Sequence, residues 1–234
     1  MLGSLKTIAM KGGGSNNMVE RILIEEIEKL YLSIQDEIKA RLEEFKRLWG
    51  TGTEEDIFAE LVFCILTPQS RAKLCWDAVN NLLNKNLLLK GSKNQILKEL
   101  DGVRFKYKKA EYIAEAGKQF LTEGKISIKS QISRFSDFYD ARDWLVQNVK
   151  GIGYKEAGHF LRNIGLGENL AILDRHILKN LKFLGVIKEI PNSLSRKRYL
   201  EIEKKMREFA EKIKIPMNHL DFVLWCKETG EIFK

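Results

Sequence analysis

Two glycines, a lysine and an aspartate make residues 151–174 the part of the chain best suited to chemistry. Gly151 and Gly153 come shortly before Lys155, and Asp174 follows further along. Glycine permits a tight turn and a close approach to a ligand, and the amides that open the next helix have no partners within it. Such amides can bind a phosphate. The spacing therefore predicts a phosphate-binding hairpin with an amine beside it, although an ordinary helical hairpin explains the two glycines taken alone.

Lys155 and Asp174 suit two parts of one reaction. An amine attacks carbon only as the neutral base, and partial burial at the positive end of a helix disfavours its ammonium form. Lys155 is one of 40 lysine and arginine residues, so its type alone is weak evidence. Asp174 is placed to cap a helix that begins near Arg175, and a carboxylate held by helix amides stays ionised. It can then stabilise positive charge on a sugar, so capping and catalysis are compatible.

A family resemblance is carried by two motifs, Gly151-Ile152-Gly153-Tyr154-Lys155-Glu156-Ala157 and Leu173-Asp174-Arg175-His176. Together they resemble the signature of the helix-hairpin-helix DNA glycosylases. The resemblance implies an all-helical enzyme that flips a damaged nucleotide out of DNA and cleaves its glycosidic bond. It implies that Lys155 attacks C1′ of the sugar to form a Schiff base, and that Asp174 helps to activate the lysine. His176 falls where relatives often contact a phosphate, and a structural role for it is equally open.

Three further segments, residues 64–76, 102–105 and 220–234, resemble the second type of 8-oxoguanine DNA glycosylase/AP lyase, known chiefly from archaea and some bacteria. The resemblance covers about residues 30–234. Cys64, Cys75 and Cys226 are widely separated and lack the four clustered thiolates of an iron–sulfur cluster, which disfavours the endonuclease III type. The expected chemistry calls for neither a metal nor an organic cofactor.

Base recognition is expected at the tail of the chain. Oxidation at C8 turns guanine N7 from an acceptor into a donor, so an acceptor aimed at N7 favours the lesion over guanine. A backbone carbonyl or the α-carboxylate of Lys234 could be that acceptor, and the resemblance implies that this lysine helps to recognise the base. Trp225 offers a flat face for a flipped purine, and Asp221, one helical turn earlier, could accept a hydrogen bond from it. A core tryptophan and a solvated acid are the alternative interpretations.

A second DNA contact is expected where Gln69 and Ser70 begin the helix that carries Cys75. In the superfamily the matching turn enters the minor groove and helps to fill the gap left by the flipped base. A proline turn with a serine cap explains the same residues. A DNA-facing rim could be lined by Arg71, Lys73, Arg104, Lys106, Lys108 and Lys109, although a run such as residues 106–109 is typical of a solvated face.

Composition fits a partner that is a polyanion. The chain has 234 residues, a formal net charge of +8 and a pI near 9.2. We expect double-stranded DNA containing oxidised guanine as the partner and a monomeric protein. No apolar run approaches the roughly 20 residues that span a bilayer, so no membrane association is expected. The odd number of cysteines favours a reducing interior, and with the resemblance this predicts the cytoplasm or nucleoid of a prokaryote.

Apolar residues recur at helical spacing along most of the chain. They predict one stripe from Ile22 to Trp49 and a helix through Ile57 and Leu66 with a cap at Thr53 and Asp56. Further helices are expected at about 93–101, 107–122, 139–149, 154–164, 174–184, 194–213 and 217–229. Residues 124–128 are expected to be an extended connection. This predicts an all-α fold, and for the family a two-lobed one with the DNA and base groove between the lobes and the hairpin at about 139–164.

Residues 1–18 differ from the rest, because residues 11–17 have the composition of a linker. They are expected to be an expression remnant or a flexible extension, with the glycosylase over residues 19–234. The predicted function is excision of 8-oxoguanine through a lysine Schiff base, followed by strand cleavage. The alternatives are a related glycosylase for another oxidised base and a non-catalytic helix-hairpin-helix module that binds DNA.

Overall fold

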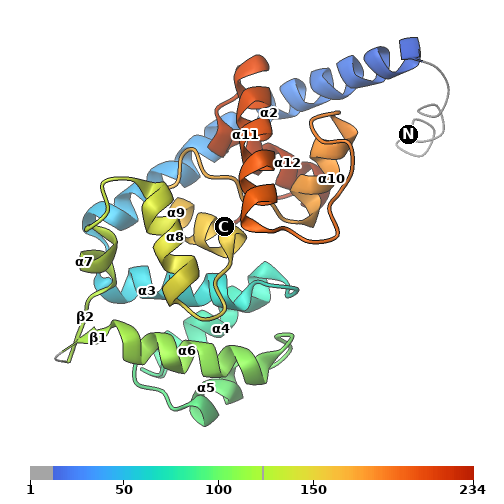
Figure 1. The fold of residues 1–234 in the computed structure, drawn as a ribbon. Helices are drawn as coiled ribbons and strands as arrows, with labels where there is room; N and C mark the ends of the chain where they lie inside the picture. Colours follow the sequence, from blue (N-terminus) through green and yellow to red (C-terminus); the bar gives the residue numbers. More distant parts are fainter. Residues whose placement is uncertain (1–12, 123) are drawn as a thin grey trace. The chain divides into compact units, whose positions relative to one another are not determined.

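The structure is a computed structural model that describes residues 13–122 and 124–234 (Figure 1). Apart from one two-stranded hairpin, the regular elements of this part of the chain are helices, as the sequence predicted. They are α2 (Gly13–Thr51), α3 (Glu54–Leu66), α4 (Ala72–Asn84), α5 (Lys93–Glu99), α6 (Lys106–Phe120), β1 (Leu121–Thr122), β2 (Lys125–Ile126), α7 (Ile128–Ile132), α8 (Phe138–Asn148), α9 (Tyr154–Asn163), α10 (Arg175–Phe183), α11 (Arg196–Lys212) and α12 (Met217–Thr229).

The chain divides into two compact units. The α3 unit consists of Arg41–Ile172 together with Lys234, and the described part of the α12 unit consists of residues 13–40 and Leu173–Phe233. The helix α2 contributes residues to both. Each unit is a set of helices packed on its own apolar residues, which is the layered solution expected of helices with one apolar stripe.

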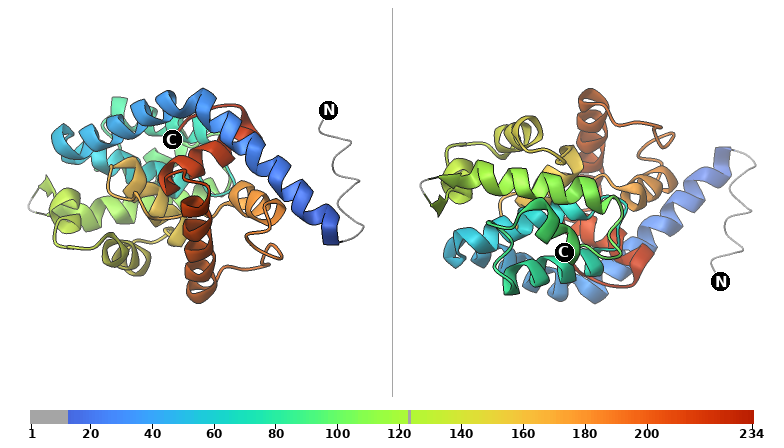
Figure 2. Two further views of the ribbon diagram at one scale, coloured as in Figure 1. Left: turned by 90° about the horizontal axis from the view of Figure 1, so that it is seen from above. Right: turned by 90° about the horizontal axis from the view of Figure 1, so that it is seen from below.

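The α3 unit is organised around its buried central helix. Every residue of α3 from Ile57 to Leu66 is buried, and α4, α6, α7 and α9 pack against it. In Figure 1 and in the right-hand view of Figure 2, α6 lies alongside α5. Because residues 57–66 of α3 are buried, a polar side chain in this stretch needs a hydrogen-bond partner inside the protein.

The α12 unit places α10 and α11 against α12 (Figure 1). Leu220, Phe222 and Val223 on α12 are almost fully buried. Tyr199 on α11 is also buried, and its hydroxyl accepts a hydrogen bond from the Leu173 amide at 3.3 Å. This bond fixes the chain just before Asp174.

Local signals placed several elements correctly. Thr53 and Asp56 form a complete capping box at the start of α3, with the Asp56 amide 3.1 Å from Thr53 Oγ1 and the Thr53 amide 2.9 Å from Asp56 Oδ2. The extended stretch near residue 125 is β2, which pairs antiparallel with β1. Among the described residues, no helix has the length and apolar character needed to cross a membrane.

The amino-terminal prediction is partly wrong. The helix α2 begins at Gly13, so residues 13–17 continue the helix although their composition is typical of a linker. Residues 1–12 lie outside the described part of the chain. That residues 1–18 are an expression remnant stays a prediction.

Candidate active site and DNA interface

The turn between α8 and α9 needs glycine at its first position. Gly151 has φ +86°, and a Cβ there would lie 2.5 Å from a ring carbon of Tyr112 on α6. Backbone freedom and missing side-chain volume are therefore both required. The hairpin is closed further by Tyr154, whose hydroxyl donates to Asp143 on α8 at 2.9 Å. The predicted hairpin is confirmed at residues 138–163.

Gly153 is the N-cap of α9 and has no side chain to occupy the amides of the first turn. The carboxylate of Glu156 instead accepts from the Gly153 amide at 3.1 Å, which satisfies the cap residue itself. The second and third amides of a helix normally bond to the cap side chain. A glycine cap leaves them for another acceptor, which is the arrangement that suits an external phosphate.

Lys155 lies in the first turn of α9, beside these amides. Its Nζ lies 3.1 Å from Glu156 Oε1, and its side chain is 22 % exposed. The same carboxylate thus bridges the hairpin amide and the amine. Glu156 was missed as a partner of Lys155 in the sequence, although glutamate three residues after a helix cap is a recognised capping signal.

The groups around Lys155 in the α3 unit include two that burial keeps neutral. Burial raises the pKa of the Cys64 thiol well above its ordinary value, with a further contribution from Glu60. Burial also holds the pKa of His159 well below its ordinary value, and the positive charges of Arg162 and Lys155 act in the same direction. The nearby histidine is therefore an uncharged ring, and the thiol stays protonated.

Lys234 is tied into the interior of the α3 unit. Its Nζ forms an ion pair with Glu60 on α3 and lies 3.4 Å from the centre of the Trp76 ring. Glu60 is 2 % exposed and also accepts from Asn163 Nδ2 at 3.0 Å. A buried carboxylate needs such partners. A single glutamate inside the apolar run 57–66 is therefore a signal in the sequence for a buried polar site.

The start of α4 was predicted wrongly. The helix begins at Ala72 with Arg71 as its N-cap, and Gln69 and Ser70 belong to the preceding turn. Ser70 Oγ accepts hydrogen bonds from the Arg104 amide at 3.1 Å, just before α6, and from Lys109 Nζ on α6 at 3.2 Å. The Ser70 hydroxyl therefore does not cap α4. Gln69 is exposed and has φ +57°, a conformation that costs a residue with a Cβ some stability.

The run of charges at residues 106–109 is only partly a solvated face. Tyr107 is 67 % exposed, but Lys109 is 4 % exposed. The interpretation of the whole run as a solvated face is therefore wrong at Lys109, because α6 turns this side chain toward the end of α3.

In the α12 unit, Asp174 caps α10 as predicted. One of its carboxylate oxygens, Oδ1, accepts from the amides of His176 and Ile177, each at 2.8 Å. These two amide bonds fix the position of the carboxylate at the start of α10. The second oxygen makes none of these bonds to the helix.

The predicted base-recognition residues do not share one unit. Trp225 and Asp221 lie on α12, whereas Lys234 belongs to the α3 unit. Trp225 is partly buried, and its ring meets the ring of His176 edge to face, with the centres 5.3 Å apart. Asp221 is 4 % exposed, so the alternative of a solvated acid is wrong. The structure thus brings Trp225 and His176 together.

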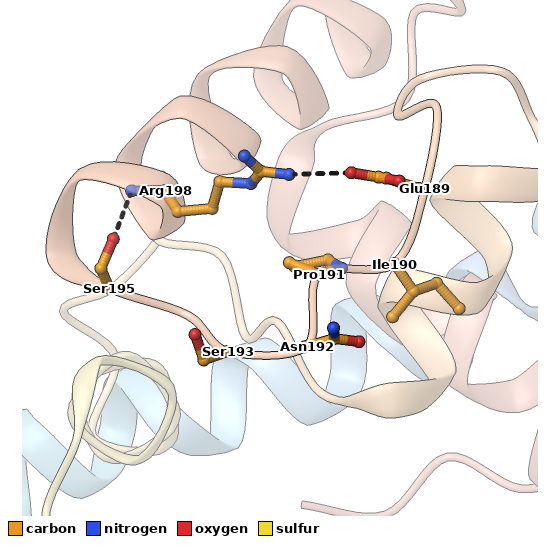
Figure 3. Close-up of a pocket in the computed structure, with 7 residues that line it drawn as sticks. All are labelled: Glu189, Ile190, Pro191, Asn192, Ser193, Ser195 and Arg198. Atoms are coloured by element: carbon orange, nitrogen blue, oxygen red, sulfur yellow. Dashed lines mark hydrogen bonds and ion pairs between the residues drawn. The ribbon is translucent and has the colours of Figure 1, made fainter.

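A surface pocket of about 370 Å³ lies in the loop between α10 and α11 (Figure 3). Glu189 and Arg198 form an ion pair beside it, with 3.4 Å between Oε1 and Nη2. None of the predicted site residues lines this pocket, so we do not assign it to the reaction. Within the described residues, no group of three or more histidine, cysteine or acidic side chains is arranged to hold a metal.

Comparison with known proteins agrees with this geometry. Residues 38–215 match the family model described as 8-oxoguanine DNA glycosylase. The chain belongs to this family. The 8-oxoguanine DNA glycosylase/AP lyase of Fusobacterium nucleatum is 49 % identical over 209 residues, which cover 89 % of this chain and 96 % of that protein. The protein of the same name from Methanocaldococcus jannaschii is 41 % identical over 221 residues, covering 91 % and 100 %.

Solved structures of this family are similar as well. The crystal structure of the 8-oxoguanine DNA glycosylase of Thermotoga maritima matches with a TM-score of 0.79 and 38 % identity, covering 92 % of this chain and 100 % of that one. The Methanocaldococcus jannaschii 8-oxoguanine glycosylase/lyase in complex with a 15mer DNA containing 8-oxoguanine matches with a TM-score of 0.82 and 38 % identity, covering 91 % and 100 %. The helix-hairpin-helix fold of the family is thereby confirmed for this chain.

Proposed function

We propose that the protein excises 8-oxoguanine from double-stranded DNA and then cleaves the strand at the resulting abasic site. The observation that carries the proposal is the amine of Lys155 at the start of a helix whose cap, Gly153, leaves first-turn amides available. The relatives named 8-oxoguanine DNA glycosylase/AP lyase support the same activity. They come from bacteria and archaea, which supports action on the DNA of a prokaryote.

Binding of a phosphate is the first step of the proposed mechanism. The first-turn amides of α9 donate hydrogen bonds to a phosphate next to the lesion, and the positive end of the helix dipole favours the negative charge of that phosphate. The oxidised guanine then leaves the base stack, at a cost of a few kcal/mol. This brings C1′ of its sugar to the amine.

Lys155 supplies the nucleophile in the next step. After its ammonium has lost a proton, the nitrogen forms a bond to C1′ while the bond from C1′ to the base breaks and its electrons leave with the base. The nitrogen then loses a proton, and its lone pair forms a double bond to C1′ while the bond from C1′ to O4′ breaks and O4′ takes up a proton, which opens the sugar ring. The resulting protonated imine makes the proton on C2′ acidic. Loss of that proton and departure of the 3′ phosphate complete β-elimination. The ionised carboxylate of Asp174 stabilises the positive charge that develops on the sugar.

Base selection is proposed for Lys234, Trp225 and Asp221. Because the Lys234 side chain is engaged by Glu60 and Trp76, we assign the acceptor for the N7 hydrogen of 8-oxoguanine to the main-chain oxygens of Lys234. Trp225 provides a ring for stacking, and the buried carboxylate of Asp221 provides an acceptor for an N–H group of the purine. Gln69, Ser70, Arg71 and His176 are proposed to contact the DNA outside the base site.

Borohydride trapping tests the reaction class. Three duplexes are compared, containing 8-oxoguanine, thymine glycol or an abasic site. We expect covalent adducts and strand cleavage with the 8-oxoguanine and abasic duplexes. Faster reaction with thymine glycol would favour a glycosylase for oxidised pyrimidines, and binding without an adduct on every duplex would favour a non-catalytic module.

Substitution of Lys234 tests base selection separately. Lys234→Met removes the ion pair with Glu60 and should lower excision of 8-oxoguanine about tenfold, because the main chain at this position is no longer held. Trapping on an abasic duplex should persist, since no base is present there. Lys188→Met, at an exposed lysine, is the control. Equal excision by the two variants would remove Lys234 from base selection.

A further inference from the structure

Lys109 on α6 is a buried lysine whose hydrogen bonds all go to one short segment. Its Nζ donates to the carbonyl oxygens of Leu66 at 2.7 Å and Pro68 at 2.8 Å, and to Ser70 Oγ at 3.2 Å. An ammonium has three hydrogens to donate. Three oxygens from alternate residues therefore match its full donor capacity.

These acceptors surround Gln69. Leu66 is the last residue of α3, and its carbonyl has no partner within that helix. Pro68 and Ser70 flank Gln69 directly, and Gln69 is the exposed residue with the left-handed backbone. The Arg104 amide, which also donates to Ser70 Oγ, adds a bond from the segment before α6. The turn at residues 67–71 is thus held from α6 on both sides of its strained residue.

Burying a lysine at this position costs free energy of solvation. The three acceptors of Lys109 are neutral oxygens, and a buried ammonium without a paired charge loses its solvation. Burial accordingly lowers the pKa of Lys109 to about 8. An apolar side chain would fill the same volume without that cost. What it could not do is bind three oxygens of one turn at once, so the specific contribution of Lys109 is to fix the geometry of the turn.

We propose that Lys109 is a positioning residue that holds the turn 67–71 in the shape that presents Gln69 and Arg71 to DNA. The inference rests on the proposed function, in which this turn contacts the duplex around the extruded base. Lys109 itself does not touch the reacting atoms. It acts by keeping the turn formed before DNA arrives, so that binding does not have to order it.

The test compares Lys109→Met with Lys118→Met, which changes an exposed lysine on the same helix. Extrusion of the lesion is followed by the fluorescence of a 2-aminopurine placed beside it, and excision is measured in a single turnover. We expect Lys109→Met to lower both the 2-aminopurine signal and the rate of excision about tenfold. Trapping on an abasic duplex, where no base needs to be extruded, should change less than about threefold. An equal fall in excision and trapping would overturn the proposal, as would no change in either.

A double-mutant cycle with Gln69→Ala separates positioning from a general loss of structure. If Lys109 acts through the turn, the double variant should extrude the base no worse than Lys109→Met alone. Effects that multiply would overturn the proposal. If Lys109→Met lowers the unfolding midpoint by more than about 10 °C, the cycle is repeated with Ser70→Ala in place of Lys109→Met. Ser70→Ala removes one acceptor of Lys109 and leaves the lysine in place. Excision by the unchanged chain tests the proposed function on its own, so the two failures can be told apart.

Discussion

The amino termini of α9 and α10 differ in what binds the amides of the first helical turn. At α10 the carboxylate of Asp174 occupies the amides of His176 and Ile177. At α9 the cap is Gly153, which has no side chain to offer its first turn. The first arrangement fixes an internal negative charge, and the second leaves donors for an external one. The proposed charge-stabilising carboxylate and the proposed phosphate site thus differ in the residue that caps the helix.

The largest effect is expected from removing the amine of Lys155, which lies beside the first-turn amides of α9. Lys155→Gln should abolish borohydride trapping and lower strand cleavage at least about a thousandfold, because glutamine forms no imine. Binding to an abasic duplex, measured by gel shift, should persist. Lys150→Gln, in the same hairpin, removes a lysine that pairs with Glu115 at 2.9 Å and serves as the control. A full-strength adduct in Lys155→Gln would exclude this residue as the nucleophile.

The next effect concerns the internal charge at α10. Asp174→Asn should slow excision about a hundredfold or more, because asparagine removes the negative charge while still capping a helix. Unfolding followed by circular dichroism should show little change. The matched control is Asp137→Asn, since Asp137 caps α8 through the Tyr139 amide at 2.8 Å. If both variants turn over normally, Asp174 is only a cap.

A smaller effect is expected from making α9 resemble α10. Gly153 has a negative φ, and the nearest obstacle to a Cβ is the Glu156 carboxylate at 3.0 Å, the end of a flexible side chain. Gly153→Ser should therefore fold and bond to its own helix. Affinity for an abasic duplex should fall about threefold to tenfold, and the salt dependence of binding should flatten by about one ion. Gly50→Ser, in open space on α2, is the control, and identical binding by the two variants would separate phosphate binding from the α9 amides.

The smallest effect is a dependence of base extrusion on pH through Lys109. Its pKa is about 8 against an ordinary 10.5, so the 2-aminopurine signal should fall severalfold as the pH rises through about 8. The pKa of Lys109 is lowered further by the positive charges of Lys155 and Arg104 and is raised by the negative charge of Glu156. Burial raises the pKa of the neighbouring Cys75 thiol to about 11, so this thiol stays neutral near pH 8.

The free energy of unfolding should change with pH in the opposite direction to base extrusion. Between about pH 8 and 10.5 the unfolded chain binds more protons at Lys109 than the folded chain, so this residue makes the free energy of unfolding rise with pH. Extrusion and thermal unfolding are therefore measured on the same samples, with Lys109→Met as the control that should lack the extrusion change. A parallel loss of extrusion and stability would indicate general unfolding instead.

Features that depend on neighbours within a few residues could be predicted from the amino-acid sequence. Helical spacing predicted most helices to within two or three residues, and the cap at Asp174 and the turn at Gly151 followed from residue type. The motif at 151–157 also pointed to the family that the comparisons confirm. These signals are local because a helix, its caps and a tight turn satisfy their own backbone groups.

Which charged side chains are buried, and which groups they bind, depends on packing between segments that are far apart in the sequence. Glu60 and Lys109 each lie in a stretch whose pattern describes the helix surface but not the element packed against it. Glu60 meets Lys234 from the far end of the sequence, and Lys109 meets residues 66–70. The free energy of a buried charge depends on such distant partners. A local pattern can therefore indicate that Glu60 is buried, but it identifies the partner of neither Glu60 nor Lys109.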